Sequence, residues 1–184
     1  MKNNDLTENK SYKEYLKHIT TFIFDVDGVL TDGNIMVNTD GEMFRTMNIK
    51  DGYGLKVAVD RGYNVCVISG GSNEGVRVRL RNLGIKDIFL GISEKTEILE
   101  GYLTNNDLKA ENVLYMGDDL PDLEIMKEIG LPTCPQDAVP EIKAISKYVS
   151  HKKGGKGCVR DVIEQVMKVQ GKWMVSSGVS AKYD

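Results

Sequence analysis

Short apolar runs recur along the chain, and most of them stop abruptly at glycine, serine or aspartate. The first run covers residues 21–24 and ends at Asp25. Comparable runs occupy residues 63–68, 88–90, 113–116, 131–134 and 148–150. Runs of this length without polar alternation are typical of strands buried on both faces of a parallel sheet.

Helical patterns separate these runs, over residues 51–61, 73–83, 94–103, 121–129 and 159–169. Ser72 is expected to cap the second helix, and Gly84 and Gly130 are expected in the left-handed conformation after helices. Strands that alternate with helices predict crossover connections and a parallel sheet. The fold expected is a three-layer α/β/α sandwich with a central parallel sheet, Rossmann-like in architecture.

Residues 33–49 break this alternation and predict a β-hairpin. Asp40-Gly41 is a strong turn signal between two short apolar stretches. The domain boundaries expected are a flexible extension over residues 1–17, one domain over 18–173 and a flexible tail over 174–184. An isolated hairpin is marginally stable in water, so this one is expected to protrude and pack on another subunit.

Composition excludes several classes of protein. The net charge is −3 and no basic stripe is present, so nucleic-acid binding is not expected. No apolar run approaches the roughly 20 residues of a membrane span, and the polar N-terminus has no signal-peptide core. The three cysteines, Cys66, Cys134 and Cys158, form no metal or disulfide spacing. A cytoplasmic protein without membrane partners is predicted.

Polar residues gather where the predicted strands end. Asp25 and Asp27 follow the first run, Ser69 ends the second, Lys95 follows the third, and Asp118 follows the fourth. Ligands of open α/β sheets bind at the carboxyl ends of the strands. Carboxylates, a lysine and a hydroxyl at one edge suit phosphoryl transfer with Mg²⁺, because hard oxygen ligands suit this ion and a carboxylate can attack phosphorus.

Asp25 and Asp27 are two residues apart, so in an extended stretch both side chains point the same way. One carboxylate can attack while the other protonates the leaving oxygen. Alone, this spacing is common on protein surfaces. Here it follows Phe-Ile-Phe and precedes Gly-Val-Leu-Thr-Asp-Gly, which is a far more specific string.

Four segments together resemble the motifs of the haloacid dehalogenase superfamily. They are DVDGVLTDG (residues 25–33), Ser69-Gly70, Lys95 and GDDLPD (residues 117–122). The short connection before Asp51 leaves no room for a cap domain, so the chain resembles the capless branch. NIKDGYG (residues 48–54) and GGKG (residues 154–157) with Arg160 are similar to its 3-deoxy-D-manno-octulosonate (KDO) 8-phosphate phosphatase family.

The resemblance implies a role for each motif residue. Asp25 is expected to be the nucleophile, and Asp27 the acid/base, with its backbone carbonyl on the metal. The remaining roles fall to Ser69 and Lys95 as phosphate-holding catalytic residues, to Asp25, Asp27 and Asp118 as Mg²⁺ ligands, and to Asp119 and Asp122 as supports for metal waters or for Lys95.

Substrate contacts are implied as well, at Asn48, Ile49, Lys50, Asp51, Gly52, Lys56, Arg79 and Lys95. The chain departs from the family at Gly71, where many members carry a basic residue. The missing cation would then come from Arg77, Arg79 or a neighbouring subunit. Lys56 in place of arginine gives up bidentate carboxylate geometry. The loop over residues 154–157 is either a linker or a segment that closes over an anion.

The resemblance implies a sugar-acid phosphate substrate, most specifically KDO 8-phosphate in lipopolysaccharide synthesis, and a homotetramer with the hairpins at its interface. One alternative substrate is a nine-carbon sialic-type (KDN or N-acylneuraminate) 9-phosphate. Two other classes are a receiver-like signalling domain, which also combines magnesium with a phospho-aspartate, and a catalytically idle scaffold. The motif order argues against a receiver.

Overall fold

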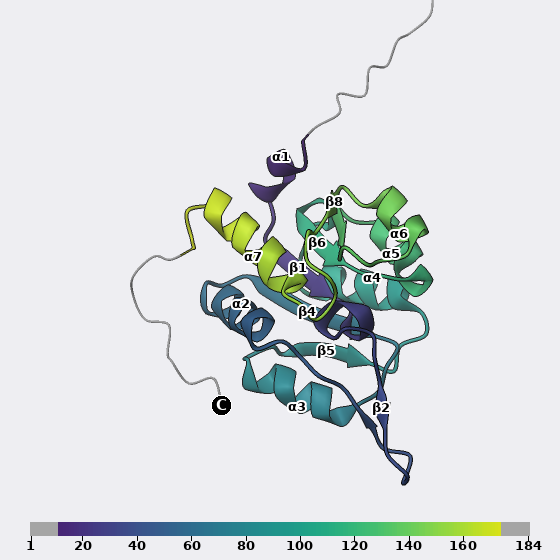
Figure 1. Cartoon of the computed structure of the whole chain (residues 1–184). Helices are drawn as coiled ribbons and strands as arrows, with labels where there is room; N and C mark the ends of the chain where they lie inside the picture. The colour runs from purple at the N-terminus through teal and green to yellow at the C-terminus, as the bar shows by residue number, and fades with distance from the viewer. Residues whose placement is uncertain (1–10, 174–184) are drawn as a thin grey trace, which may run out of the picture.

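A six-stranded parallel sheet forms the centre of the structure, in the order β5-β4-β1-β6-β7-β8 (Figure 1). The structure is a computed structural model, and it describes residues 11–173. The strands are β1 (Thr21–Phe24), β4 (Asn64–Ser69), β5 (Asp87–Leu90), β6 (Val113–Met116), β7 (Leu131–Cys134) and β8 (Tyr148–Val149). Each of the six predicted apolar runs overlaps one of these strands.

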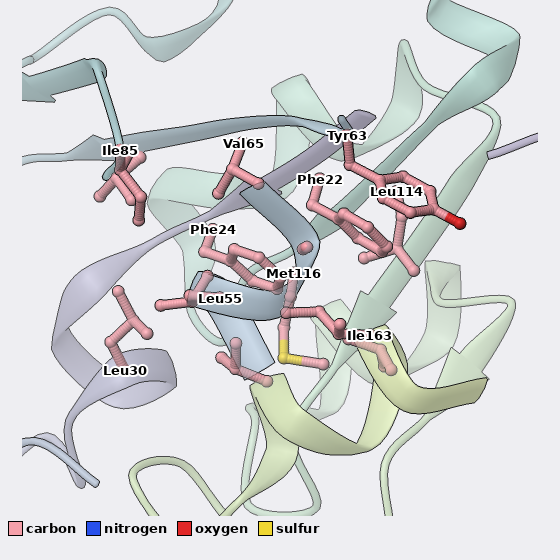
Figure 2. Close-up of a cluster of buried hydrophobic side chains, with 14 of the residues drawn as sticks. Phe22, Phe24, Leu30, Leu55, Tyr63, Val65, Ile85, Leu114, Met116 and Ile163 are labelled. Atoms are coloured by element: carbon pink, nitrogen blue, oxygen red, sulfur yellow. The ribbon is translucent and has the colours of Figure 1, made fainter. Parts of the chain in front are cut away.

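β1 is buried throughout because it lies between β4 and β6 and has helices on both faces. Phe22 and Phe24 are buried in one core cluster, and Ile23 is buried in the other. Figure 2 shows the first cluster, in which Leu55 of α2 (Ile49–Asp60) and Ile163 of α7 (Cys158–Val169) pack near the two phenylalanines. The alternation of side chains along a strand thus divides one short run between two cores.

Two helix layers cover the sheet, and the predicted three-layer sandwich is confirmed. One layer holds α1 (Tyr12–Leu16), α2 (Ile49–Asp60), α3 (Glu74–Asn82) and α7 (Cys158–Val169). The other holds α4 (Lys95–Asn105), α5 (Leu123–Lys127) and α6 (Pro140–Ile145). Within residues 11–173, no helix has the length and apolar character needed to cross a membrane.

Several local predictions need correction. Asn73, not Ser72, caps α3, because its side chain accepts a hydrogen bond from the Val76 amide. Gly84 is left-handed as predicted, with φ of +89°, whereas Gly130 does not have positive φ. A Cβ on Gly130 would overlap the Glu111 carbonyl, so close packing explains that glycine.

Two helices near the sheet edges also differ from the prediction. The helix predicted over residues 121–129 divides into a 3₁₀ turn, Leu120–Asp122, and α5, and another 3₁₀ turn, Ala110–Asn112, precedes β6. α6 was not predicted at all. It has only 6 residues, too few to show a clear helical period.

The predicted flexible extension over residues 1–17 is wrong where α1 forms. The Tyr12 ring lies 4.7 Å from the ring of Tyr148, and its hydroxyl donates to Gln165. Leu16 is buried in the core. Residues 1–10 and the predicted tail over 174–184 lie outside the described residues.

A small hairpin joins β1 to α2 and projects from the domain (Figure 1). It consists of β2 (Met36–Val37) and β3 (Met43–Phe44), which pair antiparallel. Gly41 takes the positive φ of +81° that the turn requires. Since only the hairpin separates the first loop from α2, the described chain has no cap domain, as predicted.

The glycine-rich loop over residues 154–157 packs against the loop that follows β1. A Cβ on Gly154 would overlap the Gly28 carbonyl. The Gly155 amide donates to the Val29 carbonyl at 2.9 Å. This segment is therefore part of the framework around the first motif, and not a free linker.

Candidate active site

The carboxyl ends of the central strands bring the predicted catalytic side chains into one pocket. Asp25 follows β1, Ser69 ends β4 and Asp118 follows β6. Together with Asp27 and Lys95, they line a pocket of about 510 Å³. Residues far apart in sequence meet here because neighbouring parallel strands end at the same edge.

Asp25 is nearly buried at 7% exposure. Its backbone amide donates to the Met116 carbonyl, which continues the sheet pattern beyond β1. Burial raises the pKa of Asp25 to about 6, with a further contribution from the charge of Asp122, and Lys95 opposes this rise. The Lys95 ammonium lies 3.0 Å from Asp25 Oδ1, so a cation already stands beside the carboxylate.

Lys95 is held in place by Asp122, one of the two roles predicted for that residue. Its Nζ donates to Asp122 Oδ1 at 2.7 Å. The Tyr115 hydroxyl donates to the same oxygen at 2.7 Å. Asp122 Oδ2 accepts from the Asp118 amide at 3.0 Å. Asp122 is thus a buried carboxylate that accepts hydrogen bonds from several surrounding groups. Tyr115 is a supporting residue that was not predicted from the sequence.

Asp25, Asp118 and Asp122 form the one carboxylate cluster with metal-ligand spacing in the described part of the chain, with ligand atoms within 4.8 Å of one another. Asp25 Oδ1 and Asp118 Oδ1 are both buried without a geometrically formed hydrogen bond from a described group, and Asp25 Oδ1 has only the ion pair with Lys95 beside it. Asp122 already accepts its own hydrogen bonds. Asp25 and Asp118 are therefore the carboxylates that fit a hard cation such as Mg²⁺.

The pKa of Asp118 is raised further than that of Asp25. Burial raises its pKa to about 8, and the charges of Asp25 and Asp122 add to the effect. A carboxyl that holds its proton near neutral pH exchanges that proton for a metal when one binds. This behaviour supports the predicted ligand role of Asp118.

Gly28 explains how Asp118 reaches the first loop. Its φ is +91°, and a Cβ there would overlap Asp118 Oδ2. Any other residue would be strained and would displace the Asp118 carboxylate. The glycine that follows Asp27 in the first motif is therefore required by the geometry of the fourth.

Asp27 lines the pocket, yet its side chain is outside the carboxylate cluster. Arg45 holds it instead, with Nε 2.6 Å from Oδ1 and Nη2 3.0 Å from Oδ2. Arg45 follows β3 of the hairpin and was not predicted as a site residue. Its one sequence signal is its place as a cation in an apolar hairpin next to the first motif.

Ser69 is buried and accepts a hydrogen bond from the Gly71 amide at 3.3 Å. This contact leaves its hydroxyl proton available to an anion in the pocket. Arg77 does not supply the cation missing at Gly71, because it binds Glu74 and the Ile88 carbonyl. Asp119 lines the pocket and caps the turn at Leu120.

Two predicted substrate residues are engaged in structural contacts. Asn48 caps α2 through the Lys50 amide and donates to the Gly155 carbonyl. Asp51 is buried and accepts from the amides of Gly157 and Arg160, at 3.1 and 2.7 Å. Burial raises the pKa of Asp51 to about 6. Both residues join α2 to the glycine-rich loop.

Apart from Lys95, the other predicted substrate residues lie outside the Asp25 pocket within the described chain. Ile49 and Lys50 are exposed, and Lys56 forms an ion pair with Asp60. Arg79 lines a second pocket of about 310 Å³, between the hairpin and α3. A Cβ on Gly52 would come within 2.9 Å of its Nη2. The structure thus brings the predicted catalytic residues together in one pocket, whereas most of the residues predicted to bind the sugar lie outside it.

Known proteins are similar to this chain in both sequence and fold. The sequence pattern of the haloacid dehalogenase-like hydrolases matches residues 84–163. The chain is 37% identical, over 89% of its length and 87% of the relative, to a 3-deoxy-D-manno-octulosonate 8-phosphate phosphatase of Salmonella typhi. The corresponding protein of Escherichia coli K12 is 36% identical over the same shares.

Solved structures agree with these relatives. The phosphatase of that name from Yersinia pestis superposes with a TM-score of 0.89 and 32% identity, over 92% of each chain. The enzyme from Moraxella catarrhalis, solved with magnesium, phosphate and KDO, gives a TM-score of 0.85 and 34% identity, over 88% of this chain and 93% of that one. The chain therefore belongs to the 3-deoxy-D-manno-octulosonate 8-phosphate phosphatase family of the haloacid dehalogenase-like hydrolases.

Proposed function

We propose that this protein hydrolyses KDO 8-phosphate to KDO and phosphate, with Mg²⁺ as its cofactor. The observation that carries the proposal is the meeting of Asp25, Lys95 and Asp118 in one pocket with Asp27 at its side. That this set occurs in a chain related to KDO 8-phosphate phosphatases over most of its length supports the choice of substrate.

Asp25 and Asp27 divide the chemistry. An Asp25 oxygen attacks phosphorus, and the bond from phosphorus to the sugar oxygen breaks while Asp27 gives that oxygen a proton. The product is an aspartyl phosphate on Asp25 and a free sugar. Asp27 then takes a proton from water, the water oxygen attacks phosphorus, and the bond to Asp25 breaks to release phosphate.

The surrounding residues hold the phosphoryl group during these steps. Lys95 and Ser69 contribute positive charge and a hydroxyl donor to its oxygens. Asp25 and Asp118, together with the Asp27 carbonyl, would hold Mg²⁺, which supplies further positive charge for the phosphoryl oxygens. Asp122 keeps Lys95 oriented, and Asp119 supports the turn beside the metal.

We assign the sugar-acid end to Asn48–Gly52, Lys56 and Arg79, in a site completed by a neighbouring subunit of a homotetramer. The exposed apolar hairpin supports this assembly, because Met36, Val37 and Phe44 are at least half exposed in the single chain. The domain would extend to residue 173 and would begin before residue 18, because Leu16 of α1 is buried in its core. The protein would act in the cytoplasm of a Gram-negative bacterium, where KDO enters lipopolysaccharide.

Phosphate release from KDO 8-phosphate, with Mg²⁺ and with EDTA, tests the proposal. Asp25→Asn should abolish turnover, by more than about 10⁴-fold, while the fold survives, because it removes the nucleophile. Asp107→Asn is the matched control, since Asp107 is exposed and lies beyond the C-terminal end of α4, whose first residue, Lys95, lines the pocket. Magnesium-dependent turnover by Asp25→Asn at the wild-type rate would refute the mechanism.

The alternatives give different results in the same assay. Faster turnover of a nine-carbon sugar-acid 9-phosphate would assign the sialic-type substrate instead. A stable phospho-aspartate that does not turn over would favour a receiver-like role. Absence of both phosphorylation and turnover, across sugar phosphates, would indicate an idle scaffold.

A further inference from the structure

We propose that Arg45 is a positioning residue for the reaction. It holds the carboxylate of Asp27 toward the pocket, and Gly71 leaves the space that the Arg45 side chain needs to reach Asp27. The inference rests on the proposed function, because it concerns how Asp27 serves as acid and base. The residue acts through Asp27 and is not assigned a contact with the substrate.

Two parallel contacts fix the orientation of Asp27. Nε and Nη2 of Arg45 bind its two carboxylate oxygens, at 2.6 and 3.0 Å. A guanidinium that binds in this forked way restricts rotation of the carboxylate in a manner that a lysine cannot. Asp27 needs such a partner, because its side chain is 32% exposed in an irregular loop.

Arg45 is itself well fixed. Its side chain is 8% exposed, although it belongs to a protruding hairpin. A buried guanidinium is costly unless its charge is paired and its donors are used. The Asp27 carboxylate supplies that pairing, so each residue stabilises the position of the other.

Gly71 leaves the space that this pair occupies. A Cβ at this position would lie 3.0 Å from Asp27 Oδ2 and 3.3 Å from Arg45 Nη2. A larger side chain would therefore press on both partners at once. Position 71 has no charge of its own, and the hairpin delivers a cation to the same place.

The backbone of the hairpin is tied down beside this pair. Asn73 donates from Nδ2 to the Met43 carbonyl at 3.0 Å, and its Oδ1 caps α3 through the Val76 amide. Met43 lies two residues before Arg45, and Asn73 lies two residues after Gly71. The Asn73 side chain thus joins the backbone of the hairpin near Arg45 to the start of α3 near Gly71.

The consequence differs between leaving groups. A sugar alkoxide is a poor leaving group and needs a proton from Asp27 as it departs, whereas p-nitrophenolate leaves without one. Misplacing Asp27 should therefore slow the first step, the transfer of the phosphoryl group to Asp25, far more for an alkyl phosphate than for p-nitrophenyl phosphate. The later hydrolysis of the aspartyl phosphate is common to both substrates, so the first step is compared through kcat/KM. General damage to the fold or to the metal site would slow both equally.

The experiment compares Arg45→Gln, Arg45→Lys and wild type on both substrates. For Arg45→Gln, kcat on KDO 8-phosphate should fall by about 10- to 100-fold, with KM changed by less than about 3-fold, since proton transfer by a placed group is worth about 10²–10⁴-fold. On p-nitrophenyl phosphate kcat/KM, which reports the step in which the leaving group departs, should stay within about 3-fold. Arg45→Lys should recover part of the loss. Arg81→Gln, on the exposed side of α3, is the control.

Equal losses of kcat/KM on the two substrates would overturn the proposal, and so would a change confined to KM. If Arg45→Gln does not fold, Gly71→Ala replaces it, because its methyl group would press on Asp27 while both charges remain. The same selective loss is then expected, and an equal loss refutes the inference. The comparison needs only one alkyl phosphate substrate, so a wild type that prefers another sugar phosphate would overturn the proposed substrate and leave this test intact.

Discussion

Asp118 illustrates how a single residue is placed at a cost to stability. It is surrounded by Asp25 and Asp122, and one of its buried oxygens has no donor among the described groups. Its pKa is raised from 3.8 to about 8. A carboxyl with a raised pKa contributes stability that is present below pH 4 and is lost as the pH rises through about 8. The metal-free protein should therefore be strained at alkaline pH.

Asp118→Asn should raise the melting temperature of the metal-free protein at pH 8.5 by a few degrees, equivalent to about 1–2 kcal/mol. Its advantage over wild type should disappear near pH 4. Addition of MgCl₂ should stabilise wild type and leave the variant unchanged. Thermal unfolding in EDTA and in MgCl₂ provides the measurement, with Asp107→Asn as a control. A magnesium shift of wild-type size in Asp118→Asn would contradict the ligand role.

Sequence and structure agree at this scale wherever a residue sits at a strand end. Asp25, Ser69 and Asp118 could be predicted to meet, because parallel strands end together. Arg45 and Tyr115 could not, because their contacts depend on three-dimensional approach. Tyr115 lies within an apolar strand, and its hydroxyl reaches Asp122 across a turn; from sequence alone it is indistinguishable from a core aromatic residue.

At the scale of elements, Asp51 joins α2 to α7 through two backbone amides. Its pKa is raised from 3.8 to about 6, chiefly by burial. The protonated form is thus favoured in the folded state, and the stability it contributes is present below pH 4 and lost as the pH rises through about 6. Ionisation should cost the wild type about 2–3 kcal/mol across this range.

Asp51→Asn should lose this dependence on pH and also one of the two acceptor contacts, at a cost of about 1–2 kcal/mol. The variant should therefore be clearly less stable than wild type at pH 4.5, and the difference should shrink or reverse at pH 7.5. Urea unfolding at both pH values, in EDTA, measures it. A difference that grows with pH would mean that the amide contacts to the ionised carboxylate outweigh its burial.

Element boundaries were predictable where the hydrophobic period was long. The six strands and the helices α2, α3, α4 and α7 follow the predicted ranges within a few residues. α6 and α1 were missed because they have 6 and 5 residues, and tertiary packing stabilises helices this short. Ser72 and Asn73 are neighbours, and both residue types commonly cap helices. The sequence therefore does not show which of the two side chains accepts the hydrogen bond at the start of α3.

At the scale of the whole molecule, the catalytic half of the site, which is the set of residues around Asp25, is gathered within one chain. The sugar half, which is the set of residues predicted to bind the sugar acid, is dispersed. Asn48–Gly52 and Lys56 lie on α2 outside the pocket, and Arg79 lines a separate cavity beside the hairpin. The hairpin meanwhile exposes Met36 to 71%. An apolar surface of this kind is expected to be covered by a partner, and a second copy of the chain would bring further groups to the pocket edge.

Met36→Glu tests whether assembly completes the sugar half. If the hairpins form the interface of the proposed homotetramer, a charge there should dissociate it, because the carboxylate would lose water without gaining a partner. KM for KDO 8-phosphate should rise by about 10-fold or more, whereas turnover of p-nitrophenyl phosphate should change little, since that substrate needs only the catalytic half. Light scattering after gel filtration gives the oligomeric state, and steady-state kinetics give the two constants.

Val169→Glu is the matched control, because Val169 is an exposed apolar residue at the end of α7, far from the hairpin in sequence and in the fold (Figure 1). It should leave both assembly and kinetics unchanged. A monomeric Met36→Glu with an unaltered KM would show that one chain suffices for the sugar. In that event Arg79 and its cavity, already beside Arg45 and the hairpin, would have to receive the sugar acid without help from a neighbour.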